Sequence, residues 1–143
     1  MEPTEDTLQL IRSGAPPIRF KGHLLFMFTS HAPGGTLWYE LALFEKASGG
    51  YVAQIIFFSK RSGEKDIHHV SVARTLDEAA AFFEGHDVRL DIPTEHVPAD
   101  DTLPVATRVV QATALAQRLD EAQREYGHAV MKALTELTAL MDA

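Results

Sequence analysis

The sequence of 143 residues contains no cysteine. That absence excludes a disulfide framework, thiolate-bound zinc and a cysteine nucleophile, and it fits a reducing compartment. The apolar runs are also short, far below the ~20 residues of a membrane-spanning helix. The acidic N-terminus, with Glu2, Glu5 and Asp6, lacks the apolar segment of a secretory signal. We therefore expect a soluble, cytoplasmic protein that does not interact with membranes.

Familiar catalytic and phosphate-binding motifs are missing as well. The chain has no Gly-x-Ser-x-Gly nucleophile elbow. Its two Gly-Gly pairs, at 34–35 and 49–50, lie between expected strands and not at the strand-to-helix junction that cradles a phosphate. The sequence therefore predicts no catalytic residue, which favours a protein that is not an enzyme.

The seven histidines show no recognised metal-binding spacing. His68 and His69 are adjacent in an expected strand, so their side chains point to opposite faces and cannot chelate one ion together. The sequence predicts no metal site and no cofactor. A metal site formed by residues that are distant in the sequence shows no such spacing. The candidate ligands for a site of this kind are His31, His86, Asp87 and His96.

Charge is distributed unevenly along the chain, whose formal net charge is −7. Residues 12–74 carry eight basic and four acidic groups, whereas residues 75–143 carry five basic and thirteen acidic groups. Such asymmetry indicates either a charged partner or helices with solvated carboxylates, and we favour the helices.

Four strand-like runs follow residue 17. They are Ile18–Thr29, Thr36–Glu45, Tyr51–Lys60 and Asp66–Ala73, separated by short turns. Turns of about four or five residues join antiparallel neighbours, so these runs predict a meander. Both faces of the sheet are apolar enough to need cover. In the first run, one face is expected to carry Ile18, Phe20, Leu24, Phe26 and Phe28.

Two helical segments are expected after the strands. Thr75 and Glu78 form a capping box for a helix over Leu76–Glu84, which Gly85 ends. Farther along, apolar residues recur at spacings of three and four from Val105 to Leu140. As one helix over Thr102–Met141, this segment would span ~60 Å. Because Gly127 costs about 1 kcal/mol in a helix interior, we favour two helices or one bent helix over an extended coiled coil.

Two shorter segments complete the expected fold. Residues 4–13, with Leu8, Leu10 and Ile11, predict a short helix, and His86–Ile92 is a candidate fifth, edge strand. The fold class is α+β: a four- to five-stranded antiparallel meander packed against a short helix and a long C-terminal amphipathic helix. We expect one domain over residues 1–143. Its parts are an N-terminal arm (1–16), the sheet (17–74), a helix with the candidate edge strand (75–100) and a helical segment (101–143).

The first half of the chain combines cations with aromatic side chains on or near the sheet. Phosphates attract cations and bases stack on aromatic rings, so this combination suits single-stranded nucleic acid or another charged partner. The usual role of aromatic residues in strands is packing in the core, which we favour. The candidate binding residues are Arg19, Lys21, His23, Trp38, Tyr39, Lys60, Arg61 and Lys65.

Glu40 lies within an otherwise apolar strand. A buried carboxylate needs a cationic or hydrogen-bonding partner, and the candidates on the neighbouring first strand are Arg19 and Lys21. A cross-strand salt bridge is the favoured interpretation, and an acid or base in a pocket with a histidine is the alternative.

Three functions follow from these patterns. The leading one is a non-catalytic binding or regulatory module that acts through protein–protein contacts, as a homodimer with an acidic helical arm. The alternatives are a single-stranded nucleic-acid-binding protein that uses the basic, aromatic sheet face, and a small enzyme with a pocket around Glu40 and a histidine.

Overall fold

The computed structural model describes residues 6–93 and 103–142. Five antiparallel strands form one sheet in the order β1-β2-β3-β4-β5, so every strand pairs with its neighbour in sequence. The strands are β1 (Asp6–Arg12), β2 (Ala15–Thr29), β3 (Leu37–Lys46), β4 (Tyr51–Ser59) and β5 (Ile67–Ala73). The meander and the α+β class are thus confirmed.

Three helices follow the sheet in the part of the chain that the structure describes: α1 (Leu76–Glu84), the short 3₁₀ helix η1 (Val88–Leu90) and α2 (Val105–Met141). The capping box at α1 is confirmed, because the Thr75 hydroxyl accepts a hydrogen bond from the Glu78 amide. The Glu78 carboxylate reaches back to the Arg74 amide, one residue before the cap. The bond to Thr75 satisfies an amide that the first turn of a helix leaves free.

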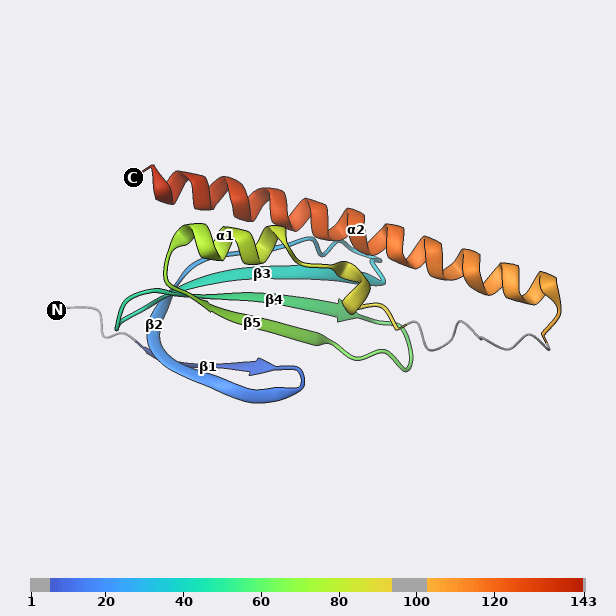
Figure 1. The fold of residues 1–143 in the computed structure, drawn as a ribbon, viewed down its shortest axis with the longest axis horizontal. Coiled ribbons are helices and arrows are strands. Elements are labelled where there is room, and N and C mark those ends of the chain that lie inside the picture. The colour runs from blue at the N-terminus through green and yellow to red at the C-terminus, as the bar shows by residue number, and fades with distance from the viewer. Residues whose placement is uncertain (1–5, 94–102, 143) are drawn as a thin grey trace.

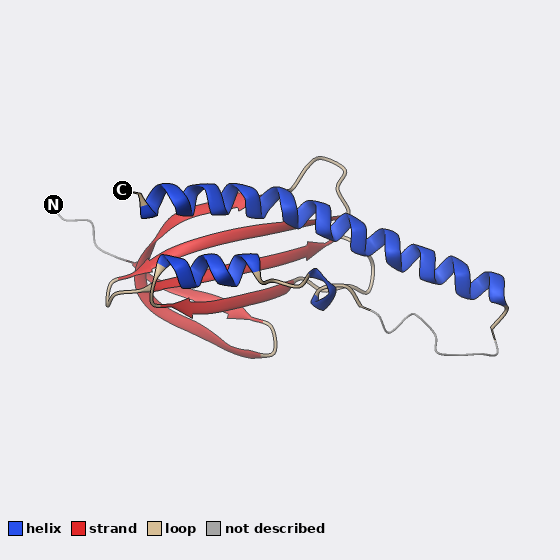
Figure 2. Cartoon of the chain, turned by 45° about the horizontal axis from the view of Figure 1, so that its top comes forward, coloured by secondary structure: helices blue, strands red, loops and turns tan. Residues whose placement is uncertain are grey.

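Both α1 and α2 cover the same face of the sheet (Figure 1; Figure 2). The main core fills the space between these layers, since alternate residues of β3 and β4 point toward the helices. Its members include Tyr39, Leu41, Leu43, Ile55, Phe57, Phe83, Ala129, Ala133 and Leu137. Small side chains such as Ala129 and Ala133 on α2 allow the helix to approach the sheet closely.

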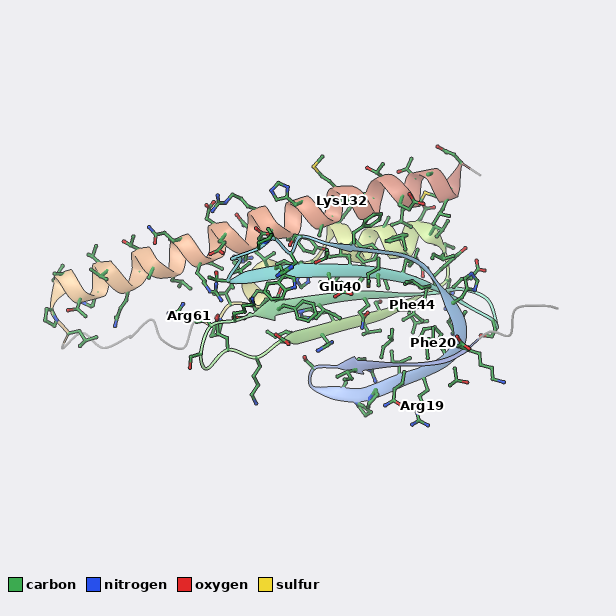
Figure 3. The ribbon with its side chains drawn as sticks, turned by 180° about the vertical axis from the view of Figure 1, so that it is seen from behind. Arg19, Phe20, Glu40, Phe44, Arg61 and Lys132 are labelled. Atoms are coloured by element: carbon green, nitrogen blue, oxygen red, sulfur yellow. The ribbon has the colours of Figure 1, made fainter. Side chains whose placement is uncertain are left out.

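The β1–β2 hairpin curls over the opposite face of the sheet (Figure 3). Its turn is tied to β5 by two hydrogen bonds, from the Ser13 amide to the His68 carbonyl (3.0 Å) and from the His68 amide to the Ser13 hydroxyl (2.8 Å). A second core lies beneath the hairpin, where the rings of Phe20 and Phe44 meet edge to face at 5.7 Å. The second apolar face therefore obtains its cover from the chain itself.

Gly22 is where β2 leaves β3 to pair with β1. A Cβ atom at this position would lie 2.1 Å from the Glu45 carbonyl oxygen, closer than any real contact. We expect Gly22→Ala to destabilise the fold by about 1–3 kcal/mol, because the backbone has to shift to relieve the clash. Chemical denaturation measures this loss. A change below about 0.5 kcal/mol would contradict the close approach that the curl requires.

The predicted helix over residues 4–13 is wrong, because Asp6–Arg12 is strand β1. Leu8 and Leu10 pack against the second core, while Thr7 and Gln9 point outward, so the period is two. The candidate strand over His86–Ile92 is also wrong. Its middle forms η1, capped by the Asp87 side chain, which accepts a hydrogen bond from the Arg89 amide.

The expected single apolar face of the first predicted run is wrong as well. The pairing of β2 with β3 shifts by one residue between Leu24 and Phe26. A one-residue bulge turns the following side chains to the other face. As a result, Phe20 lies in the second core and Phe26 in the main core, while Leu24 is exposed.

The expected break at Gly127 is wrong, because α2 runs without interruption from Val105 to Met141. Tyr126 and Ala129, on either side of this glycine, are buried against the core, and their packing outweighs the helix cost of glycine. Nothing lies within 4 Å of a Cβ built at Gly127. We therefore expect Gly127→Ala to stabilise the protein by about 0.5–1 kcal/mol, measurable as a higher melting temperature. A lower melting temperature of the Gly127→Ala variant would contradict a continuous helix through residue 127.

Candidate functional site

The basic candidate residues fall into two groups at opposite ends of β3. Lys21 lies at one end, because its carbonyl accepts a hydrogen bond from the Ala47 amide. Lys60 lies at the other end, since its amide bonds to the Thr36 carbonyl. Ten residues of β3 separate them, which is about 30 Å at 3.4 Å per residue. Figure 3 shows the same separation for Arg19, on the hairpin, and Arg61, in the loop after β4.

The remaining cations follow this division. His23 lies opposite Glu45 near the Lys21 end, and its imidazole is 3.8 Å from the Glu45 carboxylate. Lys65 belongs to the loop between β4 and β5, together with Arg61. The structure therefore brings Arg19, Lys21 and His23 together, and separately Lys60, Arg61 and Lys65. It does not form one continuous basic surface from all six.

The aromatic candidates Trp38 and Tyr39 point to opposite faces of β3. Trp38 lies on the face away from the helices, where its ring stacks on Phe58 at 5.4 Å and meets His31 at 4.3 Å. The Lys60 ammonium lies 5.5 Å from the Trp38 ring centre, a cation–π distance. Tyr39 is fully buried in the main core, so it presents no surface to a partner.

Glu40 shares the outer face of the sheet with His68, with Ile56 between them in the register. Burial raises the pKa of the Glu40 carboxyl, an effect that His68 opposes. On the neighbouring strand Glu40 faces Thr29, whereas Arg19 and Lys21 lie toward the other end of β3. The predicted salt bridge across the sheet is therefore wrong.

A cavity of about 400 Å³ lies between α2, the β4–β5 loop and Ile92-Pro93. A buried ion pair forms part of its wall: the Arg118 guanidinium donates to the Glu64 carboxylate at 2.9 Å and to the Ser59 hydroxyl at 3.0 Å. Two further polar atoms of lining residues, Arg118 Nε and Gln111 Oε1, are buried without a hydrogen-bond partner. Glu40 is not among the described residues that line this cavity.

A second polar cluster is buried under the helices, centred on Asp91. Its Oδ1 atom is 2.6 Å from His69 Nε2, and its Oδ2 atom is 2.7 Å from His86 Nε2 and 2.6 Å from the Tyr39 hydroxyl, which donates to it. These groups come from β5, the loop after α1, the end of η1 and β3. We call Asp91, His69, His86 and Tyr39 the Asp91 cluster.

The electrostatics of the Asp91 cluster keep its carboxylate ionised. Burial raises the pKa of Asp91, but the hydrogen bonds from His69, His86 and Tyr39 outweigh burial and lower it to about 2. Burial and the adjacent Asp91 charge raise the pKa of Tyr39 far above its usual range. Tyr39 is therefore a permanent hydrogen-bond donor, and Asp91 is a permanent acceptor at physiological pH.

The N-terminal part of α2 projects beyond the end of the sheet (Figure 1; Figure 2). We call Val105–Gln117 the α2 arm. Its thirteen residues carry one charge, Arg108, whereas the next 24 residues of α2 carry seven. Val105, Val109 and Val110 are 56–67% exposed, and they are three of the ten exposed large hydrophobic side chains among the described residues.

Val109 lies on the side of the α2 arm that faces away from the cavity. Val109 and Gln111 are about 160° apart around the helix at 3.6 residues per turn. Gln111, Leu115 and Arg118 line the cavity, so Val109 points to the opposite side. The apolar seam expected along the whole helix packs against the core only from Leu119 onward, where α2 lies against the sheet and α1.

Comparisons with protein families, with curated proteins and with solved structures find no match for this chain. Among the described residues, no helix is both long enough and apolar enough to cross a membrane. Function must therefore be argued from the geometry of the chain alone.

Sequence reasoning named His86 as a candidate metal ligand but missed its partners Asp91 and His69 in the Asp91 cluster. His69 and His68 do point to opposite faces, as predicted, and His69 is the one that turns toward the helices. Asp91 falls within the predicted edge strand His86–Ile92, whereas it caps the end of η1 and is 1% exposed. One available signal was the single acidic residue between apolar Leu90 and Ile92. His96, Asp100 and Asp101 lie outside the described residues.

Proposed function

We propose that this protein is a non-catalytic interaction module that forms a homodimer through the α2 arm. The observation that carries the proposal is an exposed helix of thirteen residues with one charge and three exposed valines. A helix exposed on several sides normally carries charged residues that keep it soluble. Depletion of charge is instead characteristic of the centre of a protein interface.

The composition of the α2 arm favours another helix as its partner. Five of its thirteen residues are alanine or valine on the outward side or its edge: Val105, Val109, Val110, Ala112 and Ala116. Small side chains allow helix axes to approach to about 8 Å, and valine adds apolar area. Two arms that cross at Val109 would bury their exposed valines against each other.

Charge favours the α2 arm over the other surfaces as the contact between two copies. Each chain carries a net charge of −7, so two copies repel each other. The α2 arm is the place where this repulsion costs least, because its only charged residue is basic. Isologous pairing of the same patch is also the commonest arrangement of homodimers.

Sedimentation velocity over a range of micromolar concentrations tests this proposal. We expect a species of twice the chain mass that persists at high salt, because the contact is apolar. A monomer at every concentration would overturn homodimerisation. A dimer that dissociates in high salt would overturn the assignment to the α2 arm, which carries one charge.

Single-stranded nucleic acid is a second candidate partner, favoured by the group of Trp38, Phe58, His31 and Lys60. A base could stack beside Trp38 while Lys60 contacts a phosphate. Trp38 is the only tryptophan, so its fluorescence reports directly on this group. If the alternative holds, labelled oligonucleotides should quench this fluorescence at low salt and lose the effect as salt rises. No quenching at low salt would eliminate this candidate.

A further inference from the structure

The Asp91 cluster buries an ionised carboxylate between two imidazoles at a place where apolar residues would pack. The Asp91 side chain is 0% exposed and that of His86 is 4% exposed. Replacing buried polar groups of this kind by apolar residues is often neutral or stabilising. Stability of the fold alone therefore does not require these three groups to lie together.

We propose that His69, His86 and Asp91 bind a divalent transition-metal ion, with Zn²⁺ as the best match. Their candidate ligand atoms, two imidazole nitrogens and one carboxylate oxygen, all lie within 4.8 Å of one another. Two histidines and a carboxylate suit Zn²⁺ and other borderline metals, whereas Mg²⁺ and Ca²⁺ prefer oxygen ligands alone. This site is independent of the α2 arm and adds to the proposed function.

Two of the three separations between the ligand atoms need only a small adjustment to accept the ion. Nitrogen and oxygen ligands at about 2.0–2.1 Å in a tetrahedral site are about 3.3 Å apart. The present separations of 2.6 and 2.7 Å from Asp91 to His69 and His86 must therefore widen by about 0.6–0.7 Å. Each imidazole then presents its Nε2 lone pair to the metal, and its proton resides on Nδ1.

Surrounding groups hold two of the three ligands in place. The Tyr39 hydroxyl donates to Asp91 Oδ2, which leaves Oδ1 to turn toward a metal. The Tyr126 ring lies 5.1 Å from the His86 ring, and the Tyr126 hydroxyl is fixed by donating to the Phe83 carbonyl. Such outer groups orient metal ligands and strengthen binding.

His69 forms the accessible side of the site. Its side chain is 25% exposed, whereas those of the other two ligands are almost fully buried. A metal ion and a water molecule as fourth ligand would therefore reach the site past His69. Three protein ligands and one water are the usual set of an open zinc site.

Calorimetric titration of the untagged, chelator-treated full chain with zinc chloride tests the site. We expect one Zn²⁺ per chain and no heat from magnesium chloride at the same concentration. His69→Ala should weaken binding at least tenfold, and it is the variant of choice because its partial exposure lets the fold survive. Tyr39→Phe should weaken binding about tenfold by releasing Asp91.

His128→Ala provides the matched control, since this histidine is exposed on α2 and remote in sequence from the cluster. It should leave zinc binding unchanged. Absence of zinc binding would overturn the proposal and leave the cluster as a hydrogen-bonded network. Binding that His128→Ala weakens as much as His69→Ala would also overturn it, because surface histidines would then be responsible. Circular dichroism of each variant confirms that the fold is retained.

Discussion

Asp91→Ala is expected to destabilise the protein by about 3–5 kcal/mol, measured by chemical denaturation in the presence of a chelator. Removing the carboxylate leaves Tyr39 and His86 buried without an acceptor, and each unsatisfied donor costs about 1–3 kcal/mol. It also detaches the end of η1 from β5. The loss of stability is large because one carboxylate accepts hydrogen bonds from three separate elements of the fold.

The matched control is Asp120→Ala, an exposed carboxylate on α2 that pairs with Arg124. Exposed helix pairs contribute about 0.3–0.5 kcal/mol, so the control should change stability by no more than that. Equal losses from the two substitutions would contradict the central role of Asp91. In that case the cluster would contribute no more than a surface ion pair.

The pH dependence of stability offers a second test of the Asp91 cluster. The folded-state pKa of Asp91 is about 2, below its ordinary value of 3.8. A lowered pKa contributes stability that is fully present above the ordinary value and is lost as pH falls from about 4 toward 2. This contribution is about 2 kcal/mol. Between about pH 4 and pH 2, the Asp91→Asn variant should therefore lose less folding stability than the natural chain. Equal losses in the two proteins would contradict the lowered pKa of the Asp91 carboxylate.

The second large effect is expected at the α2 arm. The double substitution Val105→Glu and Val109→Glu places four carboxylates in the contact of a dimer, and we expect at least a hundredfold weaker dimerisation. The folding stability of the double variant should change little, because these valines are 65% and 56% exposed. Sedimentation velocity measures the dissociation constant.

Met131→Glu is the matched control for the α2 arm. Met131 is 71% exposed on the same helix, but it lies outside the α2 arm. We expect its dimerisation to match that of the natural chain. If Met131→Glu dissociated the dimer and the arm substitution did not, the contact would lie on the C-terminal part of α2.

Local sequence signals predicted most of this fold because short turns determine it. The glycine-rich connections after Thr29, Lys46 and Ser59 force antiparallel neighbours, and the Thr75 cap marks the start of α1. Strand β1 was missed because its three apolar residues fit a helix or a strand equally well. Its pairing with β2 and its packing on the second core decide between them.

The parts of the candidate sites that depend on distant contacts were not predictable from pattern alone. The Asp91 cluster joins residues up to 52 positions apart, so no local spacing reveals it. Both the cluster and the continuity of α2 through Gly127 follow from packing between elements. The low charge of the α2 arm, in contrast, is visible in the sequence. That the arm projects beyond the sheet is visible only in the structure.

The absence of cysteine allows one direct measurement of the dimer contact. A single Val109→Cys substitution provides the only thiol in the chain, and Met131→Cys provides a control thiol of similar exposure. Under mild oxidation, we expect Val109→Cys to form a disulfide-linked dimer quickly and in high yield, and Met131→Cys to do so only slowly. Equal, slow cross-linking of the two variants would contradict the claim that two copies pair through the α2 arm.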